Sequence, residues 1–308
     1  MTRYHIGTAG WSYEDWNGIV YPETKPRGFH PLVFLAAFIN LIEVNSTFYR
    51  PPSPFIVASW LRRIEAFPDF LLAVKLHQVF THKGTEFSAG DADVFKTGIA
   101  PLRAGGRLAA VLVQFPWSFA NTAASRDHLR RIFELFAGYP LAVEVRHGSW
   151  DVPEFYAMLS EYQAVFCNID QPLYKNSIKP SAVATNPQLA YVRLHGRNYQ
   201  NWFRKDAGRD DRYDYLYTKD EVAEWTERIR KLGASGGKVL VVTNNHYRGQ
   251  ALANALQIKN MLSGEKIEIP ELLLRTYPEL EEIVAKIERG QKNLFAESES
   301  RAGTKDHE

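Results

Sequence analysis

The sequence predicts an α/β fold, a closed (β/α)8 barrel of the TIM type. Eight short apolar segments with strand-like composition recur along the 308 residues. Helical patterns separate most of them, which favours parallel strands. Eight units in a chain of this length fit one closed barrel better than a doubly wound open sheet. Several of the apolar segments also end in a charged or amide residue, as expected where barrel strands open onto a common rim.

The predicted strands are short apolar runs bounded by turn or loop residues. They cover residues 4–8, 41–45, 70–77, 108–115, 141–146, 164–170, 189–195 and 238–243. Helical spacing predicts helices over residues 31–38, 54–65, 91–102, 125–136, 153–162, 220–232 and 251–262. Asp91 has the composition of a helix cap, and Gly233 suits a helix end.

Several connections depart from regular alternation. Residues 46–52 are expected to be non-helical because they contain two prolines. The helix expected after the sixth strand is missing, since residues 171–188 contain three prolines and no helical period. Residues 196–219 form a long loop, and a loop of this length is usually functional or mobile. Gly7 and Gly10 predict a tight turn after the first strand.

The chain is expected to form a single domain over residues 1–290, because neither a second core nor a linker is evident. Within it, residues 270–289 predict an extra amphipathic helical segment after the barrel. The remaining residues, 291–308, are polar, and we expect them to be disordered.

Composition narrows the class of protein. Apolar residues make up 45% and charged residues 23% of the chain, values typical of a globular protein. The net charge of +2 gives no indication of a general nucleic-acid-binding surface. The one cysteine, Cys167, excludes an intrachain disulfide and is expected to be a small core residue. Because no leader peptide or membrane-spanning run is evident, we expect a cytoplasmic protein without a membrane partner.

The stretch YVRLHG at residues 191–196 carries the main clue to function. Side chains alternate faces along a strand, so Tyr191, Arg193 and His195 share one face. Ionisable residues on one face of an apolar strand are costly in a core unless they are paired or reached by water. Polar residues end other apolar runs in the same way, which points to a shared polar rim.

Several motifs taken together resemble the DUF72 family, the barrel proteins related to bacterial YecE. They are GTAGWSY at residues 7–13, IEVNSTFY at 42–49, Lys75 with Thr81 and His82, QFP at 114–116, EVR at 144–146 with Ser149 and Trp150, YVRLHG at 191–196, and Asn244 and Asn245 before Gly249. The resemblance implies a TIM-barrel-type fold. It implies no reaction, because the family has no established activity, and a fold alone does not supply one.

The predicted rim gathers three carboxylates, three permanent cations and two histidines. Its candidate catalytic residues are Glu43, Glu144, His77, His195 and Asp170. Its candidate substrate-binding residues are Trp11, Asn45, Tyr49, Lys75, Gln114, Arg146, Trp150, Arg193, Asn244 and Asn245. A polar ligand pocket is the preferred interpretation, because amides lie between the charges. A self-neutralising ion-pair network that closes the barrel end is the alternative.

The cations at the rim favour a small anionic ligand. Lys75, Arg146 and Arg193 suit a phosphate or carboxylate group. Glu43 and Glu144 are the candidate general bases, and His77 or His195 the candidate acid. We therefore predict an acid–base enzyme, hydrolase-like, that acts on a small phosphate- or carboxylate-bearing substrate.

Two other functions remain open from the sequence. The candidate catalytic residues contain enough carboxylates and histidines to hold a divalent metal, as in barrels resembling endonuclease IV or the sugar isomerases, although no close-spaced ligand motif occurs. Alternatively, the chain is a non-catalytic anion sensor that signals through residues 196–219. No nucleotide cofactor is expected, and the sequence predicts no oligomeric state.

Overall fold

Eight parallel strands close into a barrel in the computed structural model, which describes residues 2–84, 86–202, 204, 206, 208–234 and 236–285. The strands are hydrogen-bonded in sequence order, and β8 pairs with β1 to close the barrel. They are β1 (Arg3–Ala9), β2 (Leu41–Val44), β3 (Leu71–Lys75), β4 (Leu108–Gln114), β5 (Leu141–Glu144), β6 (Val165–Asp170), β7 (Leu189–Leu194) and β8 (Lys238–Thr243). The predicted (β/α)8 fold is confirmed.

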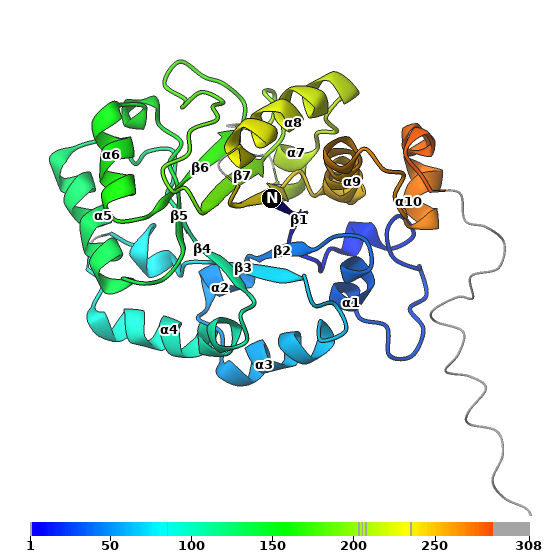
Figure 1. The fold of residues 1–308 in the computed structure, drawn as a ribbon, viewed down its shortest axis with the longest axis horizontal. Helices are drawn as coiled ribbons and strands as arrows, with labels where there is room; N and C mark the ends of the chain where they lie inside the picture. The colour runs from blue at the N-terminus through cyan, green and yellow to red at the C-terminus, as the bar shows by residue number, and fades with distance from the viewer. Residues whose placement is uncertain are drawn as a thin grey trace, which may run out of the picture.

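Helices surround the strands (Figure 1). The helices between successive strands are α1 (Pro31–Ala36), α3 (Pro54–Arg63), α4 (Ala89–Ala104), α5 (Ala123–Leu135), α6 (Pro153–Glu161) and α8 (Lys219–Gly233), and α9 (Gln250–Ser263) follows β8. Short helices occupy the connections: η1 (Glu14–Trp16), α2 (Ser46–Tyr49), η2 (Gln78–Phe80), η3 (Gly148–Trp150), α7 (Arg209–Tyr213) and η4 (Tyr247–Gly249). Residues 171–188, which lie between β6 and β7, contain no helix, as predicted.

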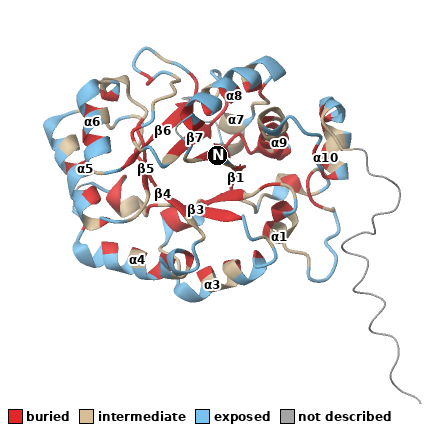
Figure 2. Ribbon diagram, viewed as in Figure 1, coloured by how far each residue is buried: buried red, intermediate tan, exposed pale blue. Residues whose placement is uncertain are grey.

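The core lies between the strands and the inner faces of the helices, while exposed residues lie on the outer faces of the helices (Figure 2). Apolar residues of the strands, such as Leu72, Val74 and Val192, are fully buried. Removing this apolar surface from water supplies the main favourable free energy of folding. The described residues include no helix of the length and apolar character needed to cross a lipid bilayer.

Two local predictions are wrong. Residues 46–52 contain one helical turn, α2, because a proline disfavours helix only at its own position and the one before, and α2 ends ahead of Arg50. The cap of α4 is Ser88 rather than Asp91. Asp91 is the third helical residue and bonds back to the Ser88 backbone, so it completes a capping box.

The role of Gly7 also differs from the prediction. It lies within β1 rather than in a turn, and a Cβ at this position would lie 1.6 Å from the carbonyl oxygen of Leu41 on β2. Glycine is therefore required for the close approach of these two strands. Gly10 does form the turn, with a φ of +87°, and its backbone N–H donates to the Glu43 carbonyl.

The C-terminal segment packs beside α9 as two short helices, α10 (Glu271–Thr276) and η5 (Pro278–Glu282). A bridge between Ile267 and Val284 ties its end to the chain after α9. Within residues 270–289, helical structure is interrupted at Tyr277 and ends at Glu282, and the structure describes this segment as far as residue 285. The predicted disorder of residues 291–308 lies outside the described residues.

Candidate functional site

Arg193 links two carboxylates from different strands at the carboxyl-terminal end of the barrel. Its Nη2 donates to Glu43 Oε1 on β2 at 2.7 Å, and its Nη1 donates to Glu144 on β5. The side chain of Arg193 is 2% exposed, and both glutamates are 0% exposed. The planar guanidinium suits this arrangement, because each terminal nitrogen satisfies a different carboxylate.

Further donors hold the two glutamates in place. The Tyr191 hydroxyl donates to Glu43 Oε2 at 2.8 Å, and Arg146 Nε donates to Glu144 Oε1 at 2.9 Å. Burial alone would raise the pKa of Glu144, but the nearby Arg193, His195 and Arg146 outweigh burial and hold that pKa well below its ordinary value. Glu144 therefore remains an ionised, buried carboxylate.

His195 is fully buried, and polar groups contact both of its ring nitrogens. The Asn244 side-chain N–H₂ group lies 2.9 Å from Nδ1, and Glu144 Oε1 lies 3.2 Å from Nε2. Guanidinium nitrogens of Arg146 and Arg193 also lie 3.4 Å and 3.5 Å from Nε2. Burial lowers the pKa of His195 to about 3, even though Glu144 raises it. The imidazole is therefore neutral at physiological pH and orients Asn244.

Lys75 differs from the two arginines because it lies against a ring rather than a carboxylate. Its Nζ is 4.1 Å from the centroid of the Phe48 ring. Within the described part of the chain, no carboxylate oxygen lies within 4.0 Å of this nitrogen. Burial and the charge of Arg193 lower the pKa of Lys75 to about 8. Lys75 is thus a cation whose charge the protein leaves largely uncompensated.

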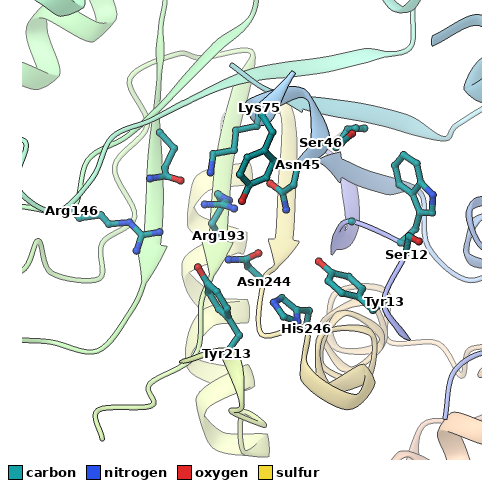
Figure 3. A pocket seen from close by; sticks show the side chains of 15 residues that line it. Ser12, Tyr13, Asn45, Ser46, Lys75, Arg146, Arg193, Tyr213, Asn244 and His246 are labelled. Atoms are coloured by element: carbon teal, nitrogen blue, oxygen red, sulfur yellow. The ribbon is translucent and has the colours of Figure 1, made fainter. Parts of the chain in front are cut away.

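These groups border a pocket of about 450 Å³ (Figure 3). Its lining consists of Gly10, Trp11, Ser12, Tyr13, Val44, Asn45, Ser46, Tyr49, Lys75, Gln114, Arg146, Arg193, Tyr213, Asn244 and His246. The lining includes three cations, several amides and hydroxyls, and no carboxylate from the described residues. Figure 3 shows Lys75 and Arg193 from β3 and β7, with Arg146 and Asn244 from the residues after β5 and β8, pointing into this space.

Eight of the ten predicted substrate-binding residues line the pocket. They are Trp11, Asn45, Tyr49, Lys75, Gln114, Arg146, Arg193 and Asn244. The other two face away from it. Trp150 is fully buried and donates from its indole to the Phe119 carbonyl, and Asn245 bonds to Tyr215 and Asn254.

The predicted catalytic residues do not line the pocket. Glu43, Glu144 and His195 lie buried behind its cationic wall. His77 lies beyond the end of β3, where its ring accepts a hydrogen bond from Val79 at the start of η2. Asp170 bonds to Arg197, which also pairs with Glu221 on α8.

Strand register explains why Asp170 and Asn245 are absent from the pocket. Residues paired in neighbouring strands face the same side of the sheet. Arg193 is inward-facing and pairs with Ile169 of β6 and Val242 of β8. Asp170 is one residue away from Ile169, so it faces outward. Asn244 continues the inward face of Val242, whereas Asn245 faces outward toward α9.

Sequence reasoning missed seven pocket residues: Gly10, Ser12, Tyr13, Val44, Ser46, Tyr213 and His246. Most lie within or beside the motifs quoted above, so membership of those motifs was the available signal. Tyr13 donates to the Ala9 carbonyl and stacks on His246 at 4.5 Å. Tyr213 comes from α7 in the long loop after β7, and its ring packs on those of His246 and Trp202.

A metal centre is not assembled from the predicted ligands. Among the described residues, no three histidine, cysteine, aspartate or glutamate side chains are grouped to hold a metal ion. Arg193 occupies the space between Glu43 and Glu144, and Asp170 is turned to the outside of the barrel. The positive charge needed by these two glutamates is therefore already supplied by guanidinium groups.

The sequence matches a known protein family. A family model described as "Protein of unknown function DUF72" matches residues 5–279. The chain belongs to the DUF72 family. The resemblance predicted from the motifs is thus confirmed, and the family description assigns no activity to this DUF72 protein.

Three similar proteins agree with this assignment. The UPF0759 protein YunF of Bacillus subtilis (strain 168) is 28% identical over 274 residues, which is 85% of this chain and 95% of YunF. The crystal structure of a DUF72 family protein (TM1631) from Thermotoga maritima MSB8 is similar, with 35% identity, a TM-score of 0.75, and coverage of 85% of this chain and 99% of that one. A DUF72 family protein (EF0366) from Enterococcus faecalis V583 gives 28% identity, a TM-score of 0.74, and coverage of 85% and 96%.

Proposed function

We propose that this DUF72 protein binds a small phosphate- or carboxylate-bearing molecule in the pocket and acts on it by acid–base chemistry. One observation carries the proposal. The pocket is lined by Lys75, Arg146 and Arg193, while the lining contributed by the described residues includes no carboxylate. A concave surface of this kind attracts anions and disfavours cations.

Charge balance identifies the group that is left to bind the ligand. Glu43 and Glu144 carry two negative charges, which Arg193 and Arg146 neutralise through direct ion pairs. Lys75 is the third cation, and no described carboxylate lies within 4.0 Å of it. An anionic ligand group would therefore compensate Lys75 while accepting hydrogen bonds from the free edge of Arg146.

The remaining lining favours a ligand that also carries hydroxyl groups. Asn45, Gln114 and Asn244 present amides, and Ser12 and Tyr13 add hydroxyls. Since Asn244 donates to His195, its carbonyl oxygen is the part left to accept from a ligand. A volume of about 450 Å³ lies in the range of small-molecule sites. We expect the ligand to be a phosphorylated or acidic polyol or sugar rather than a nucleic acid, in a cytoplasmic protein.

The reaction needs a group that exchanges protons with the ligand directly. The sequence-based candidates Glu43 and Glu144 are fully buried and paired, so they support the cationic wall rather than face the ligand. Lys75 faces the pocket and has a pKa lowered to about 8, which suits proton transfer near neutral pH. Hydrolysis of the ligand, as predicted from the sequence, would use Lys75 in place of the two glutamates.

A second candidate function is a sensor that binds the same class of molecule without converting it. The observation that favours it is the burial of both sequence-predicted bases, Glu43 and Glu144. To distinguish a sensor from an enzyme, the protein is incubated with a ligand that stabilises it, and the ligand is then analysed by mass spectrometry. An unchanged ligand favours the sensor, and a product favours the enzyme.

The binding proposal is tested by thermal unfolding with ribitol 5-phosphate and, as the neutral match, ribitol. We expect the phosphate to raise the melting temperature of the wild type and ribitol to have a much smaller effect. The variant Lys75→Met should lose most of this stabilisation. Lys231→Met is the control, because Lys231 is exposed in the last turn of α8. Equal effects of ribitol and ribitol 5-phosphate would overturn the proposal.

A further inference from the structure

The backbone of Lys75 is fixed at the mouth of the barrel. Lys75 is the last residue of β3, and its carbonyl accepts a hydrogen bond from Thr47 Oγ1 at 2.7 Å. The same hydroxyl lies 2.9 Å from the Val44 carbonyl at the end of β2. Thr47 therefore ties the ends of two neighbouring strands together, and the side chain of Lys75 leaves this fixed point to enter the pocket.

The environment of the Lys75 amine combines burial with neighbouring cations. The charged groups that act on it are Glu43 from β2, Glu144 from β5, Arg146, and Arg193 from β7. Both glutamates form direct ion pairs with arginine, so their charges are already compensated. His82, in the turn after η2, adds no competing positive charge, because burial and Lys75 lower its pKa to about 4.

Other described lysines lack this combination. Lys96 pairs with Asp93 and Lys219 with Glu282 on the outer surface. Lys259 donates to the Phe38 carbonyl, which occupies its nitrogen. Lys75 differs because its amine lies near Arg193 and Arg146 at the wall of an open pocket. Lysines that are desolvated and placed beside another cation are the ones that act as nucleophiles in proteins.

We infer that Lys75 is a carbonyl-reactive amine, which forms a reversible imine with an aldehyde or ketone on the anionic ligand of this pocket. This inference rests on the proposed function, because Arg146 and Lys75 bring the ligand in through its anionic group. It adds the class of substrate, which is a phosphate- or carboxylate-bearing carbonyl compound.

The step balances without an added oxidant or reductant. The lone pair of the neutral amine attacks the carbonyl carbon, a C–N bond forms, and the carbonyl π pair moves to the oxygen, which takes up a proton. The C–O bond then breaks and the oxygen leaves as water. The nitrogen loses its two hydrogens as protons, which balance the two protons that the oxygen takes up. The product is a C=N bond between Lys75 and the ligand, and water addition reverses the sequence.

Reductive trapping tests the inference. The full-length protein is incubated with ribose 5-phosphate, which has an open-chain aldehyde, together with sodium cyanoborohydride, and the labelled lysines are identified by peptide mass spectrometry. Near pH 7 we expect labelling of Lys75 to exceed that of Lys231 by at least about tenfold, because more of the lower-pKa amine is neutral. Labelling of Lys75 should increase through pH about 8. Equal labelling of the two lysines overturns the inference.

The variant Lys75→Arg separates this inference from the proposed function. Arginine keeps the positive charge but has no nucleophilic amine, so stabilisation by ribitol 5-phosphate should persist while trapping at this position disappears. If ribitol 5-phosphate stabilises the wild type but Lys75 is not trapped, the imine is wrong and anion binding stands. If ribitol 5-phosphate neither stabilises the wild type nor competes with trapping at Lys75, anion binding is wrong.

Discussion

Arg193 and Lys75 line the same pocket, but the protein compensates only the first of them. Arg193 lies between Glu43 and Glu144 and donates to both carboxylates. Lys75 lies over the Phe48 ring at 4.1 Å. A folded protein keeps a half-buried cation without a carboxylate partner at a cost in stability, because partial removal from water disfavours the charged form. This difference between two neighbouring cations separates a structural role from a ligand-binding role.

Lys75→Met should stabilise the protein near neutral pH. The folded state lowers the pKa of Lys75 to about 8, so its protonation costs folding free energy, and that cost is fully present below pH about 8. We expect a gain of about 1–3 kcal/mol in the free energy of unfolding, by urea titration at pH about 7. The gain should shrink as the pH rises from about 8 toward 10.5, where Lys75 is neutral in both states. If Lys75→Met is less stable than the wild type at pH about 7, the pKa of Lys75 is not lowered as described.

Arg193→Met should destabilise the fold by about 3–5 kcal/mol or prevent folding, because two buried carboxylates lose their shared partner. Urea unfolding measures the loss. Arg130→Met is the matched control, since Arg130 forms an exposed pair with Asp127 and should change stability by less than about 1 kcal/mol. Similar effects of the two substitutions would argue against a structural role for Arg193. For the same reason, loss of ligand binding in an Arg193 variant does not by itself identify a ligand contact.

Glu144 should contribute an acid-sensitive part of the stability. Its folded-state pKa is well below the ordinary value of 4.5, because its cationic partners outweigh burial. A carboxylate with a depressed pKa stabilises the folded state above its unfolded pKa, and this stabilisation disappears as the pH falls below it. The stability difference between the wild type and Glu144→Gln should therefore narrow below pH about 4.5. A constant difference between pH about 6 and 3 would contradict this interpretation.

His195 should remain neutral across the physiological range. Burial lowers its pKa to about 3, and the Asn244 amide donates to Nδ1. Nitrogen-15 NMR of histidine-labelled protein distinguishes the two neutral tautomers from the protonated ring, and His195→Gln assigns the signal. We expect no titration of this signal between pH about 5 and 8. A midpoint near pH 6.5 would restore His195 as a candidate acid.

Much of the fold follows from local sequence patterns. The eight strands were predicted because apolar runs recur along the chain, and each is present in the barrel. Several of them end one or two residues earlier than predicted, including those that end at Lys75, Gln114, Glu144 and Leu194. The connection without a helix after β6 was also predicted, since proline content is a local property. These features depend on short-range chemistry, which a single sequence shows directly.

The site was harder to predict because it depends on strand register and on loops. Asp170 and Asn245 are polar residues near strand ends, but a shift of one residue turns a side chain to the opposite face of the sheet. Tyr213 reaches the pocket through the path of a long loop, which no local pattern specifies. The burial of Glu43 and Glu144 behind Arg193 depends on the tertiary structure. The sequence therefore predicted these two carboxylates as general bases, whereas in the structure they pair with arginine.

The most direct test of the account is the pKa of Lys75 measured by NMR with and without ribitol 5-phosphate. Carbon-13 labelled lysine reports the titration, and Lys75→Met assigns the signal. We predict a pKa of about 8 in the free protein, raised by the phosphate because a bound anion favours the charged amine. A pKa near 10.5 that does not respond to ribitol 5-phosphate would contradict an uncompensated cation in an anion-binding pocket.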